Sequence, residues 1–198
     1  MPGTASHLSD RDPSESALPE VISSELVLRS QLFDVVDDRL RLDDGREIAS
    51  VSVEHPGAVA IVAIDDQERW LLVEQYRHGA RKRLLEVPAG GREEGETPEA
   101  TAAREIREET GFAADSIVRL GGAWSAPGFL TEYMHYFLAT DLRPDPLPQD
   151  DDEDISAPLR MSYEQVLAAI DDGTIEDAKT IVAAMLWQRH DSAPAGRA

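Results

Sequence analysis

GGREEGETPEATAAREIREETGF, residues 90–112 of this 198-residue chain, combines a glycine-rich turn with a helix and decides the fold. The helix is expected to begin near Thr97-Pro98, because threonine caps a helix N-terminus and proline suits the first helical position. Gly111 is expected to end it, since glycine readily adopts the left-handed conformation of a helix C-terminus. At 100° per residue, an apolar stripe that can face a core is formed by Ala102, Ala103 and Ile106.

Three glutamates of this helix, Glu105, Glu108 and Glu109, fall within one third of its circumference. Like charges four residues apart cost a helix roughly 0.2–0.5 kcal/mol per pair, which Arg104 can offset in part by reaching Glu108. Two interpretations follow. The glutamates form a solvated acidic face, or they form a cluster that binds Mg²⁺ or Mn²⁺, since these hard cations prefer oxygen ligands.

The spacing of the fixed residues favours the metal cluster. At about 7% usage per residue type, seven fixed identities in one window should arise by chance on the order of once per million such chains. The window resembles, at every fixed position, the signature box of the Nudix hydrolases, which cleave nucleoside diphosphates linked to another moiety. The resemblance implies that Glu105, Glu108 and Glu109 bind the divalent ion and that Glu108 and Glu109 take part in catalysis.

The charge balance excludes several classes of partner. The chain has 39 Asp and Glu against 19 Lys and Arg, of which only Lys82 and Lys179 are lysines, and a formal net charge of −20. Such a field repels nucleic acid polymers and anionic membranes. The acidic, lysine-poor composition reflects either a saline habitat or GC-rich coding. There is no cysteine, no apolar run near the ~20 residues of a membrane span and no signal peptide pattern, so a cytoplasmic protein is expected.

Composition and strand patterns divide the chain into four parts. Residues 1–20 are rich in Ser, Pro and acidic residues and are expected to be a disordered tail. Residues 21–55 predict a small N-terminal antiparallel β-subdomain, which buries little alone and should pack on the main domain or on a second subunit. Residues 56–190 form the main domain, and 191–198 a polar tail. Strands interleaved with helices predict an α/β fold with a mixed β-sheet sandwiched between helices, as the Nudix resemblance also implies.

Two apolar runs precede the box. GAVAIVAID, residues 57–65, predicts a central strand, and RWLLVEQYR, residues 69–77, is expected to be its hairpin partner. The next stretch, YRHGARKR at 76–83, is the densest positive segment and is either a solvated loop or a phosphate-binding element. Because it leads directly into the box, phosphate binding through Arg77 is favoured, since a guanidinium matches phosphate oxygens two at a time.

The segments around these strands resemble the ADP-ribose pyrophosphatase branch of the Nudix family. EHPGAVAIV, EQYR and LLEVPAG carry this resemblance, which implies that Arg77 contacts the pyrophosphate, Glu86 lies in the substrate pocket and the Ala89 carbonyl is a metal ligand. It also implies a homodimer built by the N-terminal β-subdomain. The arginine that commonly precedes VEHPG in this branch is replaced here by Ser50-Val51-Ser52. Either Arg46 or another group substitutes for it, or the substrate range differs.

After the box, a strand is expected at 115–124, followed by a Ser-Ala-Pro-Gly-Phe turn. The turn is either a simple bend or, by resemblance, part of the substrate side of the site. The resemblance assigns Gly128, Phe129 and Glu132 to substrate binding. Leu130 and Thr131 stand where this branch more often has Ser-Asp.

The segment RPDPLPQDDDED, residues 143–154, is a proline-rich acidic loop. Such a run is usually solvated, but by resemblance the loop covers the site and supplies a carboxylate as metal ligand or catalytic base. Glu153 is the first choice and Asp152 the second, with Asp151 and Asp154 also fitting by position. A last strand at 156–162 and two helices, at 162–173 and 176–190, complete the predicted elements.

The function implied is metal-dependent hydrolysis of the pyrophosphate of a nucleoside diphosphate sugar, with ADP-ribose giving AMP and ribose 5-phosphate. Water attacks a phosphorus atom while Mg²⁺ or Mn²⁺ neutralises the diphosphate. The alternatives are a Nudix hydrolase of another nucleotide (a GDP-sugar, a diadenosine polyphosphate or an oxidised nucleotide) and a non-catalytic nucleotide-binding module.

Overall fold

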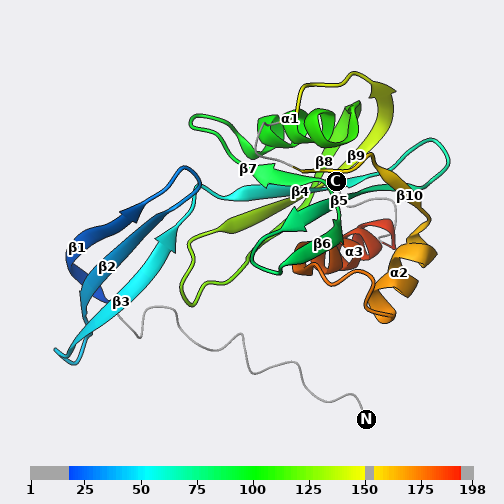
Figure 1. Cartoon of the computed structure of the whole chain (residues 1–198). Helices are drawn as coiled ribbons and strands as arrows, with labels where there is room; N and C mark the ends of the chain where they lie inside the picture. The colour runs from blue at the N-terminus through cyan, green and yellow to red at the C-terminus, as the bar shows by residue number, and fades with distance from the viewer. Residues whose placement is uncertain (1–17, 150–153, 193–198) are drawn as a thin grey trace, which may run out of the picture. The chain divides into compact units, whose positions relative to one another are not determined.

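The structure, a computed structural model, describes residues 18–149 and 154–192 (Figure 1). The chain divides into two compact units, Met1–His55 and Pro56–Ala198. In the part of the chain that the structure describes, every helix is too short or too polar to span a bilayer.

The first unit is a three-stranded antiparallel sheet with strand order β1-β2-β3. Its strands are β1 (Glu20–Arg29), β2 (Asp34–Arg41) and β3 (Glu47–Glu54). A tight turn joins β2 to β3, in which Gly45 has a φ of 84°. All ten residues of β1 are exposed, and among the described residues of this unit only Val36 is buried.

The second unit contains two sheets. The first has the order β7-β4-β9-β8, with β4 (Ala58–Ala63) parallel to β9 and the other neighbours antiparallel. The second has the antiparallel order β10-β5-β6. The remaining strands are β5 (Trp70–Arg77), β6 (Lys82–Glu86), β7 (Ala89–Gly91), β8 (Phe112–Trp124), β9 (Tyr133–Pro144) and β10 (Leu159–Met161).

The central strand β4 explains why helices cover both faces of its sheet. All six of its residues are buried, and successive side chains point to opposite faces. Val59 and Ile61 pack in one core with Ile106 of α1 (Pro98–Thr110). Ala60 and Val62 pack in the other core with side chains of α2 (Tyr163–Asp171) and α3 (Ala178–Asp191). The predicted mixed sheet between helices is therefore confirmed.

One predicted strand pairing is wrong. The segment 69–77 was expected to pair with 57–65, but only an isolated bridge between Ile64 and Trp70 joins them. Both hydrogen-bonding edges of β4 are taken by β7 and β9, so β5 passes into the second sheet. The turn between them is closed by the backbone N–H of Asp65, which donates to the carbonyl of Arg69 at 2.9 Å.

The helix of the deciding stretch begins and ends as predicted. The side chain of Thr97 accepts a hydrogen bond from the Ala100 N–H, and Gly111 ends the helix with a φ of 77°. Ala102 and Ile106 are fully buried, whereas Ala103, predicted on the same stripe, is exposed. The buried stripe is rotated toward the acidic residues and consists of Thr101, Ala102, Glu105, Ile106, Glu109 and Thr110.

Candidate active site

Helix α1 turns two of its glutamates inward against β7. Glu105 is 5% exposed and Glu109 is 2% exposed. The backbone N–H of Ala89 donates to Oε2 of Glu109 at 3.0 Å. A Cβ at position 90 would come within 2.0 Å of the Glu105 carboxylate. Gly90 is therefore required because only glycine lets the strand backbone lie so close to this carboxylate.

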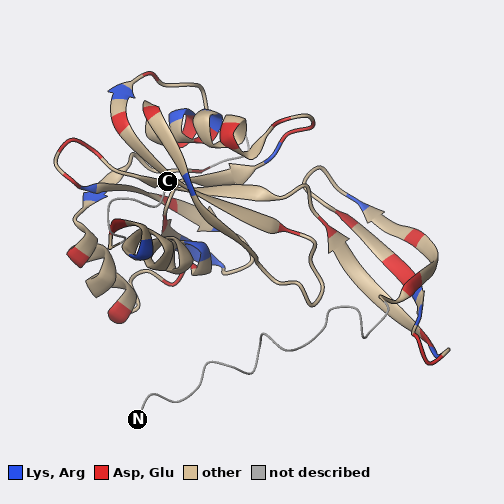
Figure 2. Cartoon of the chain, turned by 180° about the vertical axis from the view of Figure 1, so that it is seen from behind, with Lys and Arg blue, Asp and Glu red and all other residues tan. Residues whose placement is uncertain are grey.

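Arg104 is shared among three carboxylates on the outer side of this cluster. Its guanidinium donates to Glu96 at 3.0 Å, to Glu105 at 2.8 Å and to Glu108 at 2.7 Å. The hydrogen bonds from Arg104 hold the pKa of Glu96 at about 2, and those to Glu96 raise the pKa of Arg104 above its usual value. The predicted contact of Arg104 with Glu108 is confirmed. Both acidic and basic residues lie along the ribbon of this helix (Figure 2).

The donor set of this cluster fits a hard divalent cation. Carboxylates from three glutamates and the Ala89 carbonyl group offer only oxygen ligands, which Mg²⁺ and Mn²⁺ prefer. Within 18–149 and 154–192, no three acidic or histidine side chains are arranged to hold an ion as they stand. Arg104 donates to Oε1 of Glu105 and to Oε2 of Glu108, while Oε2 of Glu109 accepts from the Ala89 N–H. An ion that bound either of the two oxygens taken by Arg104 would compete with its guanidinium.

A second charge network is centred on Glu86, which is 1% exposed. Arg77 donates to its carboxylate through Nε at 2.9 Å and through a terminal nitrogen at 2.6 Å. Lys179 also donates to Glu86, and it donates to Asp177 at 3.0 Å. One buried carboxylate is thus shared by two cations. Of the four side chains, Arg77 is the most exposed, at 38%.

The two networks are neighbours along the chain and in space. Glu86 ends β6, and Ala89, three residues later, begins β7. Burial lowers the pKa of Arg77, but the hydrogen bonds and the charge of Glu86, together with the charges of Glu109 and Asp177, outweigh burial and raise this pKa. The charge of Glu109 therefore reaches Arg77, so the Glu86 network lies beside the acidic cluster.

The remaining predicted substrate residues lie in different surroundings. Arg46 belongs to the first unit, where its Nε donates to Asp44 at 2.6 Å. Gly128 and Phe129 lie in the turn before β9, and the Phe129 side chain is 59% exposed. Burial and the charges of Asp177 and Glu132 raise the pKa of Tyr136 to about 12.

The structure describes residues 143–149 and 154 of the predicted acidic loop, of which Arg143 and Pro144 belong to the end of β9. Asp151, Asp152 and Glu153, the sequence-based candidates for a metal ligand or base, lie outside the described residues. Asp154 is described, and its carboxylate accepts a hydrogen bond from Arg83 at 2.6 Å.

Sequence reasoning missed the part that α3 plays in the Glu86 network. Asp177 caps this helix and Lys179 lies in its first turn. A signal was present in the sequence, because a cation in the first turn of a helix is disfavoured by the helix dipole and calls for a compensating carboxylate. What the sequence could not indicate is that Glu86, 93 residues earlier, supplies that carboxylate.

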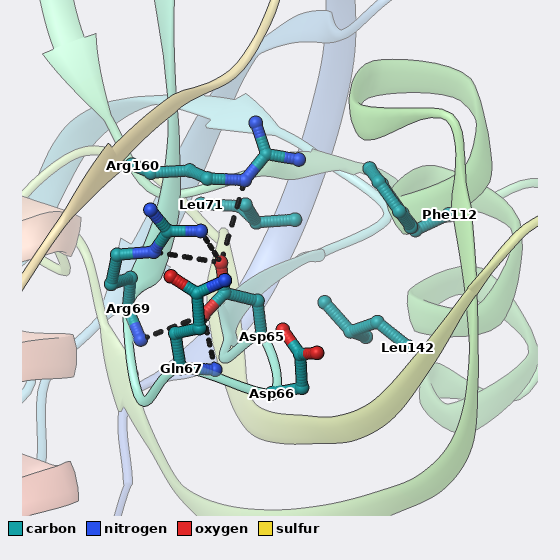
Figure 3. Close-up of a pocket in the computed structure, with 8 residues that line it drawn as sticks. All are labelled: Asp65, Asp66, Gln67, Arg69, Leu71, Phe112, Leu142 and Arg160. Carbon is teal, nitrogen blue, oxygen red and sulfur yellow. Dashed lines mark hydrogen bonds and ion pairs between the residues drawn. The ribbon is translucent and has the colours of Figure 1, made fainter.

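A separate hollow of about 500 Å³ lies beside the turn between β4 and β5 (Figure 3). Asp65 accepts hydrogen bonds from Arg69 at 2.8 and 3.0 Å and forms an ion pair with Arg160 at 3.4 Å. The Arg160 guanidinium lies 5.8 Å from the centre of the Phe112 ring. The two arginines that line the hollow, Arg69 and Arg160, are balanced by Asp65 and Asp66, so the hollow has no surplus charge. The contacts tie β10 to the turn, which is a structural role.

Comparison with known proteins finds one family model and relatives whose named substrates differ. A family model described as the NUDIX domain matches residues 54–183. The chain is 32% identical over 171 residues to an ADP-ribose pyrophosphatase of Bacillus subtilis, covering 85% of this chain and 92% of that protein. It is 45% identical over 125 residues to an ADP-ribose pyrophosphatase of Mycobacterium tuberculosis, covering 63% of this chain and 60% of that protein. A GDP-mannose pyrophosphatase of Yersinia pestis is 30% identical over 162 residues, covering 76% and 81%. A solved structure of an ADP compounds hydrolase matches 89% of this chain and 97% of its own, with a TM-score of 0.78 and 26% identity.

Proposed function

This chain belongs to the Nudix family of hydrolases, and from that premise we propose that it hydrolyses the pyrophosphate of ADP-ribose to AMP and ribose 5-phosphate. The observation that carries the proposal is the placement of the two charge networks. The carboxylates of Glu105, Glu108 and Glu109 lie next to a network in which Arg77 is the most exposed cation. A diphosphate bound with a divalent cation needs both kinds of group.

The roles of the residues follow from their chemistry. Glu105, Glu108, Glu109 and the Ala89 carbonyl would hold Mg²⁺ or Mn²⁺, which, when bound, neutralises the diphosphate and activates a water molecule. Arg77 would bind the diphosphate with two parallel hydrogen bonds, as guanidinium groups do with phosphate. Glu86 would set the direction of the Arg77 side chain, because both Nε and a terminal nitrogen of Arg77 already bind it.

Other sequence-based assignments stay part of this proposal. Gly128, Phe129 and Glu132 would contact the substrate outside the diphosphate, and either Glu153 or Asp152 would serve as base or further metal ligand. Either Arg46 or another group would replace the arginine that the ADP-ribose pyrophosphatase branch commonly carries, or the substrate range differs. Each of these roles rests on the family resemblance.

The substrate is tested with a panel of nucleotides. ADP-ribose, GDP-mannose, a diadenosine polyphosphate and an oxidised nucleoside triphosphate are each incubated with Mg²⁺, with Mn²⁺ and with EDTA, and the products are separated. ADP-ribose is expected to be cleaved fastest, to AMP and ribose 5-phosphate, and only with a divalent ion. Preferred cleavage of GDP-mannose would favour the activity named for the Yersinia relative. If the chain cleaves none of these nucleotides but still binds one of them, it is a non-catalytic nucleotide-binding module.

The first unit is proposed to form a homodimer. Its strand β1 exposes large apolar side chains, including Val21 at 59%, Val27 at 61% and Leu28 at 51%. A three-stranded sheet with so little buried surface needs a further packing partner. Sedimentation at micromolar concentration should give about twice the 21.7 kDa mass of the chain. A fully active monomer would contradict this assignment.

A further inference from the structure

Lys179 occupies a position that is costly for a cation unless it is compensated. It lies in the first turn of α3, directly after the capping residue Asp177 and Ala178. The helix dipole disfavours a positive charge there. The side chain is only 13% exposed and donates to both Asp177 and Glu86. Two carboxylates thus compensate one buried lysine, and one of the two is the partner of Arg77.

The first turn of α3 is fixed to the chain that leads into the acidic cluster. Oγ1 of Thr180 accepts a hydrogen bond from the Val87 N–H at 2.9 Å and donates to Asp177 at 2.6 Å. The backbone N–H of Thr180 also donates to Asp177, at 2.9 Å. Because Thr180 is fully buried, these contacts set the position of Lys179 relative to Glu86. The lysine is held by packing and by hydrogen bonds on both sides.

The charge of Glu86 must stay compensated at every stage of substrate binding. This carboxylate is 1% exposed, and removing the only partner of a buried charge is strongly unfavourable. Arg77 is the more exposed of its two cationic partners, at 38%, and Lys179 is the more buried, at 13%. Arg77 can therefore turn toward a ligand, whereas Lys179 is held in place.

We propose that Lys179 is a positioning residue that keeps Glu86 neutralised while Arg77 shifts its guanidinium onto the diphosphate of the substrate. The inference rests on the proposed function. Lys179 itself does not touch the substrate. It lowers the cost of loosening the pair between Arg77 and Glu86, so it acts on substrate binding through Arg77.

The variant Lys179→Met makes Arg77 the sole cation on Glu86, so the pair should loosen less readily. KM for ADP-ribose should rise on the order of tenfold, comparable to one charge-assisted hydrogen bond, with kcat within about threefold of the parent. Lys179→Arg keeps the charge and should recover most of the loss. The matched control is Lys82→Met, because Lys82 is the other lysine of the chain and pairs on the surface with Glu176.

A double-mutant cycle separates this role from a merely structural one. In the background of Glu86→Gln there is no buried charge to neutralise, so adding Lys179→Met should change KM by less than about twofold. A structural role would give the same rise in both backgrounds and would lower kcat along with thermal stability. Equal effects in the two backgrounds, or no rise in KM for Lys179→Met, would overturn the inference.

A measurement on the parent chain covers the case in which Lys179→Met does not fold. Reductive ¹³C-methylation labels only two lysines and the amino terminus. A non-hydrolysable methylene analogue of ADP-ribose should shift the Lys179 signal and leave the Lys82 signal in place. An unmoved Lys179 signal at saturating analogue would contradict the inference. If the parent chain cleaves no nucleotide of the panel, the proposed function and this inference are both overturned. If the parent chain is active but the double-mutant cycle gives equal effects in the two backgrounds, only this inference is overturned.

Discussion

The acidic cluster and the Glu86 network differ in how their carboxylates and cations are balanced. In the cluster, one guanidinium serves three carboxylates, since Arg104 donates to Glu96, Glu105 and Glu108. In the other network one buried carboxylate serves two cations, with Asp177 balancing the second. With Glu109 included, the cluster has four carboxylates against Arg104 and is left with three surplus negative charges, whereas the Glu86 network is balanced and its most exposed member is positive. A cation is attracted to the first region and an anion to Arg77 in the second.

The largest effect is expected when a carboxylate of the cluster is neutralised. Glu109→Gln keeps the side-chain size but removes a charge that is 2% exposed and lies next to Ala89. Loss of preorganised charge at a site of this kind costs roughly 10²–10³-fold in kcat. Steady-state kinetics at saturating Mg²⁺ measures it, with circular dichroism to check folding. The matched control is Glu99→Gln, an exposed glutamate of the same helix. Activity of Glu109→Gln within about twofold of the parent would mean that the cluster is only an acidic face.

Removing the exposed cation of the second region should act on binding instead. Arg77→Met leaves Glu86 paired with Lys179, so the fold should survive. KM is expected to rise about 10–100-fold, the equivalent of one or two charge-assisted hydrogen bonds. Arg83→Met is the control, because Arg83 contacts Glu74 and Asp154 on the surface. An unchanged KM for Arg77→Met would show that the diphosphate binds elsewhere.

A third variant removes Arg104, the cation that pairs with carboxylates of the acidic cluster. Arg104→Met removes the guanidinium that three carboxylates share, which should lower the free energy of unfolding by roughly 1–3 kcal/mol without metal. At about 2–4 °C per kcal/mol, the melting temperature should fall by several degrees. Adding Mn²⁺ should raise it more in this variant than in the parent, because the ion no longer competes with a guanidinium.

Arg107→Met is the matched control for that experiment. Arg107 lies on the same helix but pairs with Asp145. Its loss should leave the response of the melting temperature to Mn²⁺ unchanged. Identical responses of the two variants would contradict the idea that Arg104 and a divalent ion compete for the same oxygens.

The smallest effect concerns the pH dependence of stability. The pKa of Glu96 is lowered from 4.5 to about 2 by its hydrogen bonds with Arg104. A carboxyl group with a lowered pKa contributes stability above its unfolded-state pKa and loses it as the pH falls toward its folded-state pKa. The stability difference between the parent and Glu96→Gln should be constant above about pH 5 and shrink between about pH 4.5 and 2. Urea unfolding at several pH values measures it, and a difference that stays constant down to pH 3 would contradict the assignment.

The sequence was most informative where local rules decide the structure. Thr97, Pro98 and Gly111 predicted the bounds of α1 because capping depends on residues next to one another. Helical periodicity correctly predicted the burial of Ile106 but wrongly placed the exposed Ala103 on the same buried stripe, since the exact rotation of a helix depends on what it packs against.

Contacts between distant segments could not be derived in the same way. The pairing of β4 with β9 and the placing of β5 in another sheet depend on which strands compete for the edges of β4. The link from Lys179 to Glu86 spans 93 residues. Apolar patterns predict that a strand or helix exists but not its neighbour. For the same reason, the box and the family resemblance predicted the acidic side of the candidate site. The contribution of α3 became visible only in the structure.

The most direct test of the division between the two regions measures metal and diphosphate binding separately. Titration calorimetry would record Mn²⁺ binding, and binding of the methylene analogue of ADP-ribose without metal, for the parent, Glu109→Gln and Arg77→Met. Glu109→Gln should lose affinity for Mn²⁺ and keep its affinity for the analogue, and Arg77→Met should do the reverse. If each variant lost both ligands equally, or neither variant lost either, the acidic cluster and the Glu86 network would not be the cation and diphosphate sides of one site.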